Sequence, residues 1–246
     1  MKALGVLLLV IGVGLTGAGL FGQLVLTDNE GHHDGRVPTF ALEAVSGADE
    51  LVVEPVVPGE VDVRIERAGQ PLVDYEQLHG ARFHTFVAAE DLSSYAHAAT
   101  DDVGNDGIVP LVGIGAGALR VLAQAAPSGG PDLLELGADV LADGAPLDAQ
   151  NIATNDEWTE NGLTVTRQGL DFVLSRDWNG DDHMGAPAFL AMFRADDLAF
   201  VHDHAELIGN DRFTFSTDLP GLGEYLAAVE FVQDGELVTA LFRFEL

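Results

Sequence analysis

Hydrophobic and polar positions alternate along much of the chain, in short runs bounded by turn residues. In residues 61–67, Val61, Val63 and Ile65 alternate with charged residues, and residues 213–216 and 241–244 show a similar alternation of apolar and polar positions. Such a pattern places one face of a strand in a core and the other face in solvent. Asp234-Gly235 separates two apolar runs and suits the left-handed positions of a hairpin turn. The pattern therefore predicts an all-β fold.

The longest apolar segment lies at the N terminus. Residues 3–26 carry no charge and follow Lys2, and about 20 apolar residues are enough to cross the hydrocarbon core of a membrane. A positive charge before such a segment favours a cytoplasmic N terminus. We expect residues 1–27 to form a transmembrane helix acting as a signal anchor, or alternatively a signal peptide. Either one makes the protein a cell-membrane or exported protein whose bulk is extracytoplasmic.

Self-comparison of the remaining chain shows two diverged copies of one unit. Residues 83–99 align with residues 188–204 at an offset of 105. The aligned pairs include Asp91 and Asp196, Tyr95 and Phe200, and His97 and His202. We interpret the copies as two tandem immunoglobulin-like or cupredoxin-like β-sandwich domains, at 49–143 and 160–246. Polar stretches predict flexible linkers at 28–48 and 144–159.

The charge and the cysteine content exclude several classes of partner and of metal site. The 246 residues contain 40 acidic and 11 basic residues, a net charge of −29, and no cysteine. So negative a surface repels phosphate, which excludes nucleic acid as a partner. Without cysteine there is no disulfide framework, thiolate zinc site, iron–sulfur cluster or blue-copper centre. Lys2 is the only lysine, and an excess of hydrated carboxylates indicates a halophilic source or, alternatively, an ordinary acidic secreted protein.

Histidines supply the candidate chemistry, since six of the eight lie in or beside the repeated strand–turn–strand. Residues i and i+2 of a strand share a face, so His202 and His204 can bind one ion together. His84 and His97 can share an ion if their hairpin register aligns, and His183 is a further candidate ligand. Neutral imidazole suits copper, zinc and nickel. For His84, a hydrogen-bonded packing role is the alternative.

Other donors near these histidines are less specific. Met184 offers a softer ligand for Cu(I), and we expect carboxylates to complete the shell. The carboxylates in question are Asp91, Asp203 and Glu206. We expect His79 to be a surface residue, and the same reading is the alternative for His183. His32-His33 precedes the repeats and is either a metal-binding pair or part of a solvated linker.

The repeated segment resembles a group of extracytoplasmic proteins. Their repeat has a histidine-led strand, then Asp-Leu, an aromatic residue and His-x-His-Pro. The resemblance is carried by residues 83–87, 91–97 and 193–204, and it implies a two-repeat β-sandwich associated with heavy-metal or copper handling, FixH-like or YtkA-like or similar to copper-resistance-C domains. This sequence has Ala99 and Phe189 at histidine positions of the pattern and lacks its proline. Each copy therefore carries only part of the motif.

Catalysis has little support. Acidic pairs such as Asp101-Asp102 follow from the composition alone, and the loop starting at Asp177 has Asp182 where a calcium loop requires glycine. We therefore expect a membrane-tethered, non-catalytic protein that binds copper, zinc or another transition metal. The alternative is a tandem immunoglobulin-like interaction module of the cell envelope, with an envelope protein as partner and vestigial histidines.

Overall fold

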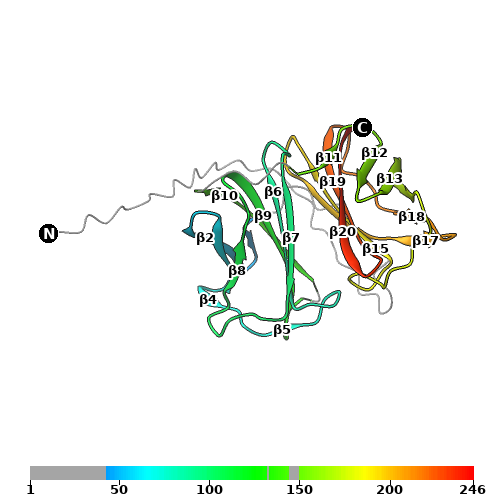
Figure 1. The fold of residues 1–246 in the computed structure, drawn as a ribbon. Coiled ribbons are helices and arrows are strands. Elements are labelled where there is room, and N and C mark those ends of the chain that lie inside the picture. Colours follow the sequence, from blue (N-terminus) through cyan, green and yellow to red (C-terminus); the bar gives the residue numbers. More distant parts are fainter. Residues whose placement is uncertain (1–42, 132, 144–149) are drawn as a thin grey trace. The chain divides into compact units, whose positions relative to one another are not determined.

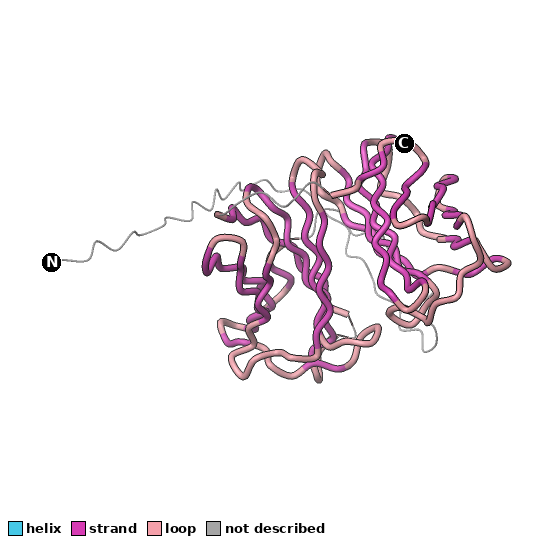
Figure 2. The backbone as a smooth tube through the Cα atoms, in the orientation of Figure 1, coloured by secondary structure: helices cyan, strands magenta, loops and turns pink. Residues whose placement is uncertain are grey.

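The computed structural model describes residues 43–131, 133–143 and 150–246, and these residues form strands, loops and turns (Figures 1 and 2). The all-β prediction is confirmed for them. None of the described residues forms a helix of the length and apolarity needed to cross a membrane. The predicted N-terminal segment and the His32-His33 pair lie outside the described residues.

The first half of the chain forms two five-stranded sheets. The strands of the first sheet are, in spatial order, β1 (Val45–Ser46), β2 (Asp49–Val57), β3 (Glu60–Arg67) and β4 (Gln70–Pro71), with β8 (Val109–Val112) also paired to β3. The strands of the second sheet are β10 (Leu134–Ala142), β9 (Gly117–Pro127), β6 (Phe83–Ala89) and β7 (Tyr95–Thr100), with β5 (Tyr75–Glu76) paired to β9. One apolar cluster contains side chains from both sheets, as expected for a sandwich.

The second half forms two further five-stranded sheets. The strands of one sheet are β11 (Ile152–Ala153), β20 (Glu236–Glu245), β19 (Glu224–Gln233), β15 (Ala188–Arg194) and β16 (Phe200–His204). The strands of the other are β12 (Glu157–Glu160), β13 (Leu163–Gln168), β14 (Asp171–Leu174), β18 (Arg212–Thr214) and β17 (Glu206–Ile208). A second apolar cluster lies between them. Strands β1, β11 and β12 begin within the two segments that the sequence predicted as linkers.

The alternation found in the sequence corresponds to these cores. Val61, Val63 and Ile65 are fully buried and point into the first cluster. Buried Phe172 and Phe213 lie opposite each other on β14 and β18 in the second cluster. Because side chains on a strand alternate between faces, the polar residues next to each of these buried residues point outward.

The two copies share the same hairpin register. Ala88 pairs with Tyr95 between β6 and β7, and Phe193 pairs with Phe200 between β15 and β16. Each residue of the second pair is 105 positions after its counterpart, the offset found in the sequence. The repeat is therefore a structural repeat as well.

Strands β6 and β15 are buried on both faces, because each also contributes side chains to a third apolar cluster. Phe86 on β6 lies with its ring centroid 5.6 Å from Phe189 on β15 and 5.0 Å from Phe200 on β16. The same cluster includes Leu122 on β9 and Leu226 on β19. The sheet containing β6 thus packs against the sheet containing β15. We call the contact between these two sheets the inter-sheet junction.

Candidate metal centre

One end of the inter-sheet junction is polar and contains all six histidines of the described residues. Two lie on the β6–β7 hairpin (His84 and His97), two on β16 (His202 and His204), and two in turns (His79 and His183). Each of them contacts at least one other histidine of this set or the buried carboxylate of Glu230.

Equivalent tight turns bring the two loop histidines to this place. In the turn before β6, His79 and Gly80 have successive positive φ angles of 48° and 89°. In the turn before β15, Met184 and Gly185 have φ angles of 56° and 84°, and His183 lies next to them. Two successive positive φ angles are typical of a type I′ turn, which reverses the chain within two residues. Each turn therefore holds one imidazole against the junction.

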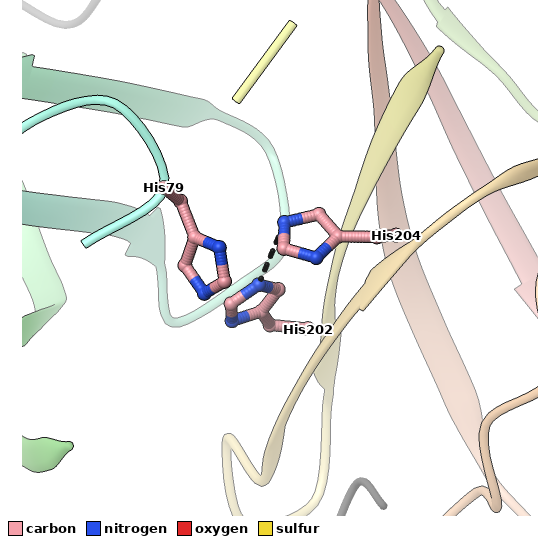
Figure 3. A group of neighbouring side chains, drawn as sticks. All are labelled: His79, His202 and His204. Atoms are coloured by element: carbon pink, nitrogen blue, oxygen red, sulfur yellow. Dashed lines mark hydrogen bonds between the residues drawn. The ribbon is translucent and has the colours of Figure 1, made fainter. Parts of the chain in front are cut away.

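The first group consists of His79, His202 and His204, all half-buried (Figure 3). The Nε2 atoms of His202 and His204 are 3.5 Å apart. The His79 ring centroid lies 5.3 Å from that of His202 and 4.3 Å from that of His204. One nitrogen of each ring lies within 4.8 Å of a nitrogen of the other two.

These separations fit a shared metal ion. Zinc binds imidazole nitrogen at about 2.0–2.1 Å, which at tetrahedral angles places two ligand atoms about 3.4 Å apart. The observed 3.5 Å between His202 and His204 is within reach of that value without movement of the strand. Three nitrogen donors and an open fourth position are a common arrangement for zinc or copper.

Gln124 orients His202 from the opposite sheet. Its side-chain amide lies 2.9 Å from Nδ1 of His202 and 2.5 Å from a carboxylate oxygen of Glu135. Burial raises the pKa of Glu135 although the hydrogen bond from Gln124 opposes this. Because an amide nitrogen donates, Nδ1 of His202 is the acceptor in this contact. Binding of an ion at Nε2 requires the amide to turn by 180°, so that its oxygen accepts from Nδ1–H. A hydrogen bond to the ring nitrogen that does not bind the ion fixes the tautomer of a metal-binding imidazole.

The second group consists of His97, His183 and Glu230. Nδ1 of His97 lies 2.7 Å from Oε2 of Glu230, and Nε2 of His183 lies 3.5 Å from the same oxygen. The Glu230 side chain is 3% exposed. Burial by itself would raise the pKa of Glu230, but the imidazoles of His183 and His97 outweigh it and lower this pKa to about 2. Nε2 of His183 is buried and makes no hydrogen bond to any described residue.

His84 continues this group toward the backbone. Its Nδ1 lies 3.4 Å from Nε2 of His97, and its Nε2 donates to the carbonyl oxygen of Leu78 at 2.7 Å. Burial, together with the nearby imidazoles, lowers the pKa of His84 to about 4, although the contact with Leu78 opposes this. The ring is therefore neutral at pH 7, with its lone pair on Nδ1 facing His97.

The two groups correspond to each other through the repeat. Gln124 pairs with His84 across β6 and β9, and Glu230 pairs with Phe189 across β15 and β19, so Gln124 and Glu230 occupy equivalent positions. In each group, the turn histidine and the β9 or β19 residue come from one copy, and the strand histidine comes from the other. Both candidate sites therefore depend on the packing of the two copies.

All five histidines predicted as ligands lie in this junction, although only four of them belong to the two three-residue groups. In the hairpin register His84 pairs with Ala99, and His97 pairs with Phe86, so the two histidines meet diagonally. His84 also makes the kind of hydrogen bond expected for the alternative reading, in which it is a packing residue and not a metal ligand. The expectation was that His84 and His97 share an ion if the hairpin register aligns them. They are not directly paired, and their rings meet only diagonally.

Several predicted donors lie elsewhere. The Asp203 carboxylate accepts hydrogen bonds from the backbone of His204 and Ser216. Asp91 accepts from the Ser93 backbone, and Glu206 is exposed. Met184 packs in the apolar cluster of the junction.

Sequence reasoning missed three polar members: His79, Gln124 and Glu230. The expectation that His79 is a surface residue is wrong, because it contacts His202 and His204. Glu230 had a usable signal, since it is the one acid within the apolar run 225–232. Gln124 is likewise the single polar residue within 121–126. A polar residue buried in such a strand requires a polar partner.

Comparisons with known proteins add little. No family model matches the chain, and no curated protein matches it. Among solved structures, the crystal structure of the FN1–FN3 domains of chicken CNTN1 aligns at 12% identity, covering 85% of this chain and 67% of that one. The TM-score is 0.26. So low a score carries no argument about this protein.

Proposed function

We propose that this protein binds a transition-metal ion, copper or zinc, without turnover, and that His79, His202 and His204 are the ligands. The observation that carries the proposal is the convergence of these half-buried imidazoles from two β-units, with ligand atoms within 4.8 Å of one another. Neutral imidazole is a preferred ligand of both metals. The strongly negative net charge of −29 also favours the approach of cations.

The ion has a structural consequence as well as a binding one. His79 belongs to the first copy, and His202 and His204 belong to the second, so an ion held by all three links the two copies. An ion that binds only the folded chain stabilises it by mass action. We therefore expect the bound ion to raise the melting temperature of the protein.

Equilibrium dialysis of the full chain against Zn(II), and separately Cu(II), tests the proposal. We expect the His202→Ala/His204→Ala variant to bind one ion fewer per chain than the wild type. The matched control is His32→Ala/His33→Ala, which removes the other close histidine pair and is expected to keep the wild-type stoichiometry. The proposal fails if the wild type binds no ion, or if the first variant keeps wild-type stoichiometry and affinity. Absence of binding would favour the envelope interaction module.

We also propose that residues 1–27 hold the protein at the cell membrane, with the histidines on the extracytoplasmic side. The support is the uncharged run at 3–26 after Lys2. In this arrangement the full chain stays in the membrane fraction after alkaline carbonate extraction, and protease added from outside degrades it. Leu8→Arg/Val13→Arg should release it, because charge at the membrane centre costs about 2.5–3.5 kcal/mol per residue. A wild-type chain extracted by carbonate would refute the anchor.

A further inference from the structure

We infer that the inter-sheet junction holds a second metal ion, bound by His97, His183 and Glu230, and that the carboxylate makes this site selective for divalent cations. This inference rests on the proposed function, since it assumes that the neighbouring all-histidine group binds an ion. It differs in its ligands: two imidazoles and one anionic oxygen in place of three imidazoles.

The geometry of the second group supports an ion between its members. The 3.5 Å between Nε2 of His183 and Oε2 of Glu230 matches the spacing of two ligands on one zinc or copper ion. Among the described residues, that buried nitrogen makes no hydrogen bond and has this long ion-pair contact with Glu230, so an ion between the two would satisfy it better. Nδ1 of His97 lies closer to the carboxylate, at the hydrogen-bond distance of 2.7 Å, so an ion between them requires these two atoms to move apart toward about 3.4 Å.

His84 explains how His97 can present Nδ1 to an ion. His84 donates from Nε2 to the Leu78 carbonyl at 2.7 Å, so its Nδ1 is an acceptor. That acceptor lies 3.4 Å from Nε2 of His97 and therefore favours a proton there. With an ion on Nδ1 of His97, the proton of the neutral ring stands on Nε2 and donates to His84. His84 is thus a positioning residue. Its hydrogen bond with Nε2 of His97 fixes the tautomer of that ring and leaves Nδ1 for the ion.

Charge distinguishes the two sites. Gln124 and Glu230 are equivalent in the repeat, and each contacts the strand histidine of its own group. The neutral amide leaves the first group uncharged when its imidazoles are neutral. The buried carboxylate gives the second group a charge of −1 when its imidazoles are neutral, and at the same distance this charge attracts a dication twice as strongly as a monocation. His183 is half-buried, with 20% of its side chain exposed, so an ion can enter the site past this residue.

Isothermal titration of the full chain with Zn(II) tests the inference. We expect two ions per wild-type chain, and one per chain in Glu230→Gln and in His183→Ala. The ion retained by these variants should keep its affinity within about threefold, which also shows that they fold. His183→Ala replaces a half-buried turn residue, so it serves if Glu230→Gln does not fold. Conversely, His202→Ala/His204→Ala should lose the first ion and keep the second.

An exchange of residues between the sites adds a gain-of-function test. Gln124→Glu/Glu135→Gln moves the carboxylate next to His202 while keeping the total charge. We expect Zn(II) affinity at the first site to rise at least tenfold, with a smaller rise for the monocation Ag(I). One ion per wild-type chain, or two ions retained by both Glu230→Gln and His183→Ala, would overturn the inference. Failure of the proposed function differs, because the wild type then binds no ion at all.

Discussion

The buried imidazole of His84 makes a quantitative prediction about stability and pH. Its pKa in the folded protein is about 4, against an ordinary 6.5. Between these values the unfolded chain takes up a proton that the folded chain does not, so acid favours unfolding. The stability from this residue is complete above pH 6.5 and is lost as the pH falls toward 4. At about 1.4 kcal/mol per pH unit, the loss is about 3 kcal/mol.

The assay is urea unfolding of the metal-free chain, with chelator and constant salt, at several pH values from 7 to 4. His84→Gln replaces the imidazole with a neutral amide whose nitrogen can still donate to the Leu78 carbonyl. We expect the variant to be less stable at pH 7, because its fit is imperfect. Its free energy of unfolding should then fall about 3 kcal/mol less than that of the wild type between pH 7 and pH 4.

Glu230→Gln is the matched control for this experiment. The carboxylate pKa of about 2, against an ordinary 4.5, assigns its stability to a lower window. That contribution is complete above pH 4.5 and is lost toward pH 2, so this variant should keep the fall between pH 6.5 and 4.5. Parallel curves for the wild type and His84→Gln across the whole range would refute the account of His84.

Three further predictions concern packing and ligand number. Gly180→Ala should destabilise the protein by about 1–3 kcal/mol in urea unfolding, because a Cβ there would lie 1.7 Å from the carbonyl oxygen of Val232; an unchanged midpoint would contradict this. Phe86→Ala should cost about 3–5 kcal/mol in the same assay, since it empties the centre of the third apolar cluster, whereas a loss below about 1 kcal/mol would mean that the junction packs loosely. Ala99→His, at an exposed site equivalent to His204, should raise Zn(II) affinity at the second site at least tenfold in titration calorimetry, and no increase would argue against that site.

Much of the fold follows from local patterns. Strict alternation predicted β3, and Asp234-Gly235 predicted the β19–β20 hairpin, because side-chain period and turn geometry are properties of a few consecutive residues. The offset of 105 between the copies reappears as an identical hairpin register. These features need no knowledge of what packs on what.

The candidate site depended more on distant contacts. The sequence indicated His202 and His204 as a pair, since residues two apart on a strand share a face. It gave no reason to join His79 to them, because 123 positions separate His79 from His202 and only the docking of two sheets brings them together. The same holds for His97 and Glu230, which lie 2.7 Å apart across the junction.

The sequence by itself determined that the chain is β-rich, acidic and repeated, and that its candidate metal ligands are histidines. Only the tertiary structure decided which histidines act together. The reason lies in strands such as β6 and β15, which are buried on both faces. One face of each belongs to the core of its own copy, and alternation along the strand cannot name the partner of the other face. That partner is the second copy of the same unit, and where the two meet, the apolar cluster gives way to six imidazoles and a buried carboxylate.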